Sequence, residues 1–147
     1  MNGWEILFQT LAAFIGTLAF SVFFHVQSKH YLLCGGIGAA GWLCYQLLYP
    51  VVGVVEACFF ATVVIIILSR FFSIRRRCPV TVYLISGIFP LVPGAGIYWT
   101  AYYCITQQSN LAISKGLETL QIAVAIVLGI VLVLEIPQKV FVKRAKA

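Results

Sequence analysis

Charged side chains are scarce in this chain of 147 residues. Only 10% of the residues are charged, with ten Lys and Arg against four Asp and Glu, whereas 62% are hydrophobic. The mean hydropathy is +1.02. Soluble domains have about 25% charged and about 45–50% apolar residues. So few charges cannot cover a surface that faces water. We therefore expect a polytopic membrane protein, with residues 1–147 forming a single transmembrane domain in contact with membrane lipid.

The sequence also lacks the patterns of several function classes. Its five cysteines form no CxxC pair, and His25 and His30 have no set of further ligands nearby, so we predict no metal and no cofactor. Neither a nucleotide-binding motif nor a His/Asp/Cys constellation for catalysis is present, and we predict that the chain is not an enzyme. The net charge of +6 comes from short loops rather than a basic face, so nucleic acid is not an expected partner.

Five apolar stretches are long enough to cross a bilayer as a helix, which takes about 20 residues. They comprise residues 4–24, 31–49, 51–69, 79–107 and 117–136. Pro50 is expected to end the second helix and Pro137 the fifth, whereas Gly116 directly precedes the fifth. None of the stretches alternates in the way that a membrane barrel requires. The predicted fold class is all-α, with about five transmembrane helices.

The basic residues predict how the chain is oriented. With five spans, nine of the ten Lys and Arg residues fall on one side, in the loop 25–30, the loop 70–78 and the C-terminal tail. Only Lys115 falls on the other side. Lys and Arg concentrate on the cytoplasmic side of membranes. We therefore expect a multi-pass protein of the cell membrane, with its N-terminus outside and its C-terminus in the cytoplasm.

Stripes of small residues predict where helices approach each other closely. They are Gly35, Gly36, Gly38, Ala39, Ala40 and Gly41 in the second stretch, Gln9, Ala12, Gly16 and Ala19 in the first, and Ala125 and Gly129 in the fifth. The stripes indicate packing against protein, in the same chain or in a partner. A plain five-helix bundle explains them equally well.

The fourth stretch is interrupted near its middle by Pro90, Pro93, Gly94 and Gly96. Each proline removes a backbone donor and biases the preceding residue away from helix. We predict two half-helices, of which the second starts near Gly94. Backbone groups freed at that depth need protein or cavity water, and transporters place such breaks at binding sites. The N–H groups of Gly94, Ala95 and Gly96 are predicted to bind a carboxylate. A simple proline kink is the alternative.

Three further side chains are candidates for the function. Glu56 lies early in the third stretch, and an ionisable residue inside a span is a functional candidate. Burial would favour its protonated form, so Glu56 is a candidate for carrying a proton in exchange for substrate. Gln46 is the candidate hydrogen-bond partner of Glu56. The alternative for Glu56 is a simple interfacial position. Tyr98, just after the break, could line a cavity or simply pack.

The stretch from Ile88 to Tyr98, with the sequence IFPLVPGAGIY, resembles the P-x-x-P-G-x-x-x-Y signature of the threonine/serine exporter family. The likeness is to the C-terminal transmembrane half of that family, which is a separate chain in some members. Phe24-His25-Val26 before a basic loop and the position of Glu56 also look like that family. The resemblance implies a secondary exporter of small carboxylate-bearing metabolites, either amino acids such as threonine and serine or dicarboxylates such as succinate.

The resemblance also implies a partner. In the split form of the family, a larger five-span subunit with a soluble region acts together with a smaller one, and this chain looks like the smaller one. Two five-span halves must be inverted relative to each other, which agrees with an external N-terminus and suits alternating access. The alternative function is a non-transporting assembly or scaffold subunit whose small-residue stripes only bind partners.

Overall fold

The computed structural model describes residues 3–137, which are helical apart from short connections. The helices are α1 (Gly3–Phe23), α2 (Tyr31–Val52), α3 (Val54–Arg76), α4 (Val80–Ile88), α5 (Gly94–Ile105) and α6 (Ser109–Glu135), with the short 3-10 helices η1 (Ser28–His30) and η2 (Phe89–Leu91). No strand occurs within residues 3–137. Four helices are long and apolar enough to cross a membrane, and α4 with α5 forms a bent fifth candidate. The predicted all-α membrane fold is confirmed.

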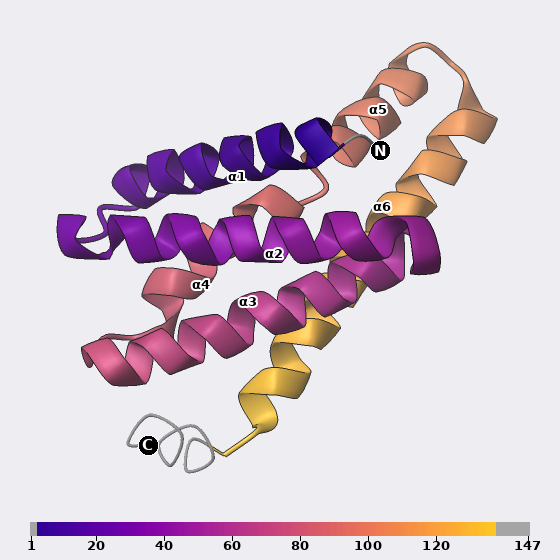
Figure 1. Ribbon diagram of the computed structural model, residues 1–147. Helices are drawn as coiled ribbons and strands as arrows, with labels where there is room; N and C mark the ends of the chain where they lie inside the picture. The colour runs from indigo at the N-terminus through magenta and orange to yellow at the C-terminus, as the bar shows by residue number, and fades with distance from the viewer. Residues whose placement is uncertain (1–2, 138–147) are drawn as a thin grey trace.

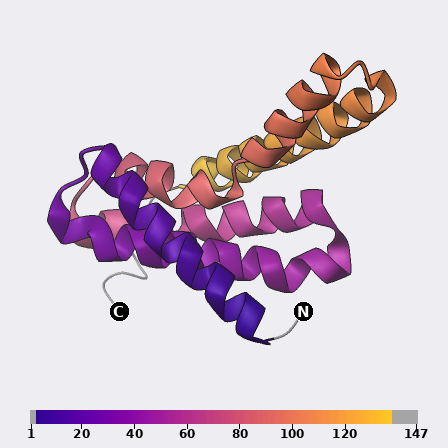
Figure 2. The same ribbon diagram turned by 90° about the horizontal axis from the view of Figure 1, so that it is seen from above.

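The helices form a row from which one hairpin departs. Helices α1, α2 and α3 lie side by side, and α4 packs against all three of them (Figure 1). Helix α6 packs on α3 and also on α5. Seen from above, α5 and the first part of α6 extend away from α1, α2 and α3, whereas the later part of α6 returns to them (Figure 2). Helix α5 consequently has no buried residue.

Small residues mediate the closest helix contacts, as expected for the second and fifth stretches. A β-carbon added at Gly38 of α2 would come within 3.0 Å of the Thr17 side chain on α1. One added at Gly41 would come equally close to Ile65 on α3. At Gly129 of α6, the added carbon would lie 3.1 Å from Thr62 Cβ of α3. Glycine at these positions therefore sets the spacing of α1, α2, α3 and α6.

The stripe predicted on the first stretch mostly faces away from the rest of the chain. Ala12 and Ala19 are exposed, and a β-carbon at Gly16 would meet no atom within 4 Å. The buried positions of α1 are instead Thr17 and Ser21. Both hydroxyl groups donate to a carbonyl of their own helix, at 2.8 Å in each case. With its hydroxyl satisfied internally, each side chain packs as a small residue.

Several helix ends lie beyond the predicted spans. The expectation that Pro50 ends the second helix is wrong, because α2 continues past it to Val52. A proline in the last turn removes only one backbone hydrogen bond, whereas the φ of +99° at Gly53 takes the chain out of the helix. Helix α3 extends to Arg76, and α6 starts at Ser109, well before Gly116. Helices can extend beyond the hydrocarbon core, which is about 30 Å thick.

The basic segments of the described chain gather at one end of the bundle (Figure 1). The guanidinium of Arg70, near the end of α3, donates to the carbonyls of Val133 and Leu134 near the end of α6. His30, after α1, and Pro79, before α4, line one shared cavity at the same end. This arrangement fits an odd number of spans. The predicted basic tail lies outside the described residues, with Lys139, Lys143, Arg144 and Lys146.

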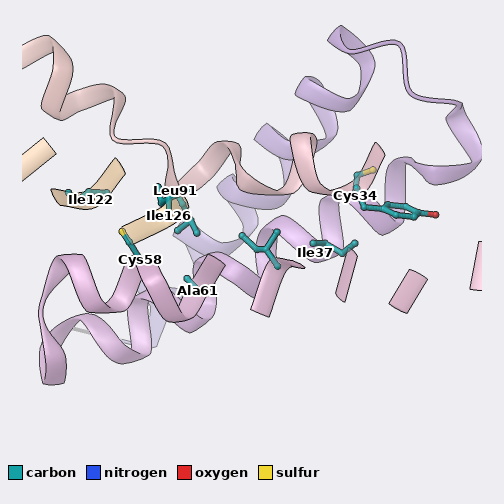
Figure 3. Packing of buried hydrophobic residues seen from close by; sticks show 9 residues of the cluster. Cys34, Ile37, Cys58, Ala61, Leu91, Ile122 and Ile126 are labelled. Atoms are coloured by element: carbon teal, nitrogen blue, oxygen red, sulfur yellow. The ribbon is translucent and has the colours of Figure 1, made fainter. Parts of the chain in front are cut away.

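The buried core includes the short helix that follows α4. The buried residues of this core are Cys34, Ile37, Cys58, Ala61, Ile65, Tyr83, Leu91, Ile122 and Ile126. Leu91 of η2 is only 4% exposed and packs with Cys58, Ile122 and Ile126 (Figure 3). The interruption of the fourth stretch therefore contacts protein at Leu91, whereas Val92, Gly94 and Ala95 are exposed. Many large apolar side chains elsewhere are exposed, which suits a lipid-facing surface.

Candidate functional site

The fourth stretch breaks where the prolines predict. Helix α4 and η2 run from Val80 to Leu91, and α5 runs from Gly94 to Ile105, with a bend of 48° between them. Each half is about 18 Å long at 1.5 Å per residue, so the break lies midway along the stretch. The predicted start of the second half-helix near Gly94 is confirmed.

The first turn of α5 has free backbone donors. Pro93 is the N-cap residue and makes no side-chain cap, since it has no polar side chain. The N–H of Gly94 donates to the Val92 carbonyl at 2.7 Å. Within residues 3–137, the N–H groups of Ala95 and Gly96 donate no hydrogen bond. A helix start normally leaves such donors to a cap, to water or to a ligand.

These donors belong to a cavity of about 370 Å³. Residues from four helices and η2 form its wall, and they are Trp42, Tyr45, Val54, Cys58, Pro90, Leu91, Val92, Pro93, Gly94, Ala95, Gly96, Trp99, Lys115, Glu118, Thr119 and Ile122. Its wall is mainly apolar, with a few polar groups, which is typical of small-molecule sites of about 300–1,000 Å³. We refer to it as the break cavity.

Five of the six predicted substrate-site residues line the break cavity, namely Pro90, Pro93, Gly94, Ala95 and Gly96. Tyr98, the sixth, is not among the lining residues. It is 62% exposed, and its ring stacks on that of Tyr102. Trp99 lines the cavity instead, because successive helical residues point about 100° apart.

The two glycines of α5 have different surroundings. A β-carbon added at Gly94 would meet no atom within 4 Å, so this position opens into free space. One added at Gly96 would come closer than 3.0 Å to Thr119 Oγ1 on α6. Gly96 therefore allows α5 and α6 to pack closely, whereas Gly94 leaves room at the helix start.

The structure does not bring Glu56 to the break cavity. Glu56 is exposed, and a β-carbon added at Gly53 would lie 3.1 Å from its Oε2, so the carboxylate lies over the start of α3. Glu56 lines a separate hollow with Gln121. Gln46 is buried and donates its amide to Gln9 Oε1 on α1. Gln46 is therefore paired across α1 and α2 rather than with Glu56.

Three polar residues of α6 also line the cavity and were not among the predicted site residues. Lys115 Nζ and Glu118 Oε2 form an ion pair at 2.7 Å, with 45% and 40% of the side chains exposed. Thr119 Oγ1 donates to the Lys115 carbonyl. An ion pair this exposed contributes little stability, so Lys115 and Glu118 are free to exchange partners. The short connection between α5 and α6 is the sequence signal that could have predicted that Lys115, Glu118 and Thr119 lie beside the break.

Comparison with known proteins identifies the family. A family model described as threonine/serine exporter, ThrE, matches residues 9–136. The chain belongs to the threonine/serine exporter family. No curated protein and no solved structure gives a match. Members of the threonine/serine exporter family are transporters, and the apolar helices agree with a multi-pass membrane protein.

Proposed function

We propose that this chain is the smaller membrane subunit of a two-component exporter, and that it binds the carboxylate of a small metabolite at the start of α5. One observation carries the proposal. Among residues 3–137, the N–H groups of Ala95 and Gly96 have no acceptor, and they lie at the start of a half-helix that borders a cavity, beside the open position at Gly94.

Electrostatics favour an anion at this position. A helix N-terminus carries about half a positive charge, which stabilises a nearby anion by about 0.3–2 kcal/mol. Each hydrogen bond to a charged group adds about 1.5–3 kcal/mol. The two oxygens of one carboxylate can accept from two neighbouring N–H groups. The indole rings of Trp42 and Trp99 also line this cavity.

The rest of the substrate would meet the ion pair of α6. Glu118 can accept a hydrogen bond from the ammonium group of threonine or serine. Lys115 can donate to the second carboxylate of a dicarboxylate such as succinate. The cavity thus holds complementary groups for both kinds of substrate, and the proposed class is small metabolites that carry a carboxylate.

The exposed face of α5 supports the need for a partner. This helix contacts mainly α6 and presents Tyr98 and Tyr102 to the outside. One wall of the binding region would then be completed by the larger, homologous five-span subunit. Two inverted halves around a broken helix suit alternating access. The basic end would face the cytoplasm and the start of α1 the outside.

Coupling to protons is a separate part of the proposal. Glu56 is the candidate carrier, although its hollow is distinct from the break cavity. Proton binding at Glu56 would act on transport through the packing of α3 against α6, since residues of both helices line that hollow.

Reconstitution tests the proposed function. The chain and its larger partner would be purified together and placed in liposomes loaded with labelled L-threonine or succinate. We expect efflux only when both subunits are present. If the two subunits co-purify but release neither compound, the chain is an assembly or scaffold subunit and the exporter proposal is wrong.

A further inference from the structure

A cavity with a charged wall lies at the basic end of the bundle. Its volume is about 300 Å³, and its walls come from the end of α3, the connection that follows and the first residue of α4. Two arginines line it, Arg70 and Arg77, together with Ser73 of α3. It shares no lining residue with the break cavity. We refer to it as the arginine cavity.

Arg70 brings a buried positive charge to this cavity. It is 4% exposed, and its guanidinium donates to the carbonyls of Val133 and Leu134 on α6. These hydrogen bonds fix the charged group between α3 and α6. The third predicted span, residues 51–69, ends directly before Arg70, so the guanidinium lies near the level where the hydrocarbon core meets the lipid headgroups. A cation fixed at this level favours an anion in the adjoining cavity.

Arg77 brings hydrogen-bond donors to the same cavity. Its side chain is exposed, and within the residues that the structure describes its guanidinium makes no ion pair. A guanidinium presents its N–H groups as a planar fork that fits two oxygens of a phosphate. Arg75 and Arg76 are exposed as well, but neither of them lines the cavity. Position, rather than charge alone, therefore distinguishes Arg77 from its neighbours.

The backbone at Arg77 is unusual for an arginine. Its φ is +50°, in the left-handed region, where the residue after a helix is usually glycine or asparagine. The N–H of Arg77 donates to the Ile74 carbonyl at 3.4 Å, and the N–H of Cys78 donates at 3.1 Å to Ser73. These two bonds fix the turn, although a side chain with a β-carbon is strained in it. Strained residues cluster at ligand-binding positions, which agrees with a function for this arginine.

We propose that the arginine cavity binds the headgroup phosphate of an anionic phospholipid. The positive wall is complementary to a phosphate, and Ile74 and Val80 form an apolar part of the same wall. Anionic lipids are enriched in the cytoplasmic leaflet, where the positive charges predict this end of the chain, and basic pockets between membrane helices bind their headgroups. Leu134, whose carbonyl accepts from Arg70, is 47% exposed and would contact the acyl chains of the same lipid.

A lipid at this position would connect three helices. Arg70 joins α3 to α6, whereas Pro79 and Val80, at the beginning of α4, form another part of the cavity wall. A headgroup beside both arginines would therefore hold the first half-helix of the broken span against α3 and α6. The proposal concerns the chain itself and does not depend on which substrate is exported.

Lipid titration of the full chain tests the binding. The purified chain is titrated with phosphatidylglycerol or phosphatidylcholine in detergent, and bound lipids are counted by native mass spectrometry. We expect one phosphatidylglycerol to bind about tenfold more tightly than phosphatidylcholine, and Arg77→Gln to remove this preference. Arg75→Gln, which removes the same charge outside the cavity wall, should keep it. Equal losses in the two variants would overturn the site, since only the total charge would then matter. A wild type without the preference would overturn it too.

Arg77→Gly separates lipid binding from a structural role. Glycine adopts the left-handed conformation without strain, so in phosphatidylcholine nanodiscs this variant should melt at or above the wild-type temperature. Phosphatidylglycerol should raise the melting temperature of the wild type by about 5 °C and that of Arg77→Gly much less. A variant that gains as much as the wild type would reject the proposal. Inorganic phosphate that stabilises the wild type equally well in phosphatidylcholine would also reject it, because the ligand would then be a soluble anion.

Discussion

Replacing Gly96 by alanine should destabilise the hairpin of α5 and α6, whether or not a ligand is bound. The added carbon would come closer than 3.0 Å to Thr119 Oγ1 and would lie 3.3 Å from Thr119 Cβ. The hydroxyl cannot move aside at no cost, because it donates to the Lys115 carbonyl at 2.7 Å. Overpacking of this kind costs about 1–3 kcal/mol. We therefore expect Gly96→Ala to lower the free energy of unfolding by that amount.

Thr119→Ala provides the complementary change. Removing Oγ1 abolishes the overlap, so the double variant Gly96→Ala/Thr119→Ala should recover most of the lost stability, with a coupling energy of about 0.5–3 kcal/mol. Gly94→Ala is the matched control, since its new carbon would meet nothing within 4 Å. The assay is reversible unfolding in mixed micelles, followed by circular dichroism. Equal stabilities of Gly96→Ala and Gly94→Ala would refute the packing role of Gly96.

Two further changes test other parts of the structure. Arg70→Gln should destabilise the packing of α3 on α6 by about 1.5–3 kcal/mol, because its buried guanidinium donates to carbonyls of α6, whereas Arg75→Gln should have little effect at an exposed position. Unfolding in the same micelles measures both, and equal losses would contradict the assigned role of Arg70. Glu56→Gln should flatten the pH dependence of efflux from liposomes. An unchanged pH profile would show that Glu56 does not carry the proton in transport.

Apolar stretches and prolines were enough to predict the helices and the break. The break was predictable because Pro90 and Pro93 act on their own local backbone, whatever surrounds them. Ends of helices were harder to predict. Pro50 was expected to end a helix, but a terminal turn tolerates proline, and the decisive feature is the positive φ at Gly53. Backbone dihedral angles of this kind depend on packing that a composition pattern does not contain.

The face of α1 and the roles of the two α5 glycines depend on tertiary contacts. Thr17 packs against Gly38 as a small residue only because its hydroxyl donates within its own helix. Gly94 and Gly96 are chemically identical, and only the position of Thr119 separates a packing glycine from an open one. The cavity between the α1–α2 connection and the start of α4 was missed for a similar reason, since its walls come from segments far apart in the chain.

The central claim is that the start of α5 binds substrate, and Gly94→Leu compared with Gly36→Leu tests it most directly. Neither glycine has a neighbour within 4 Å of an added β-carbon, but only Gly94 lines the break cavity. With equal amounts of protein in liposomes, the initial rate of substrate efflux should fall about tenfold or more for Gly94→Leu, since the leucine blocks the hydrogen bonds to the carboxylate. Gly36→Leu should retain the wild-type rate. Equal rates for the two variants would contradict the claim.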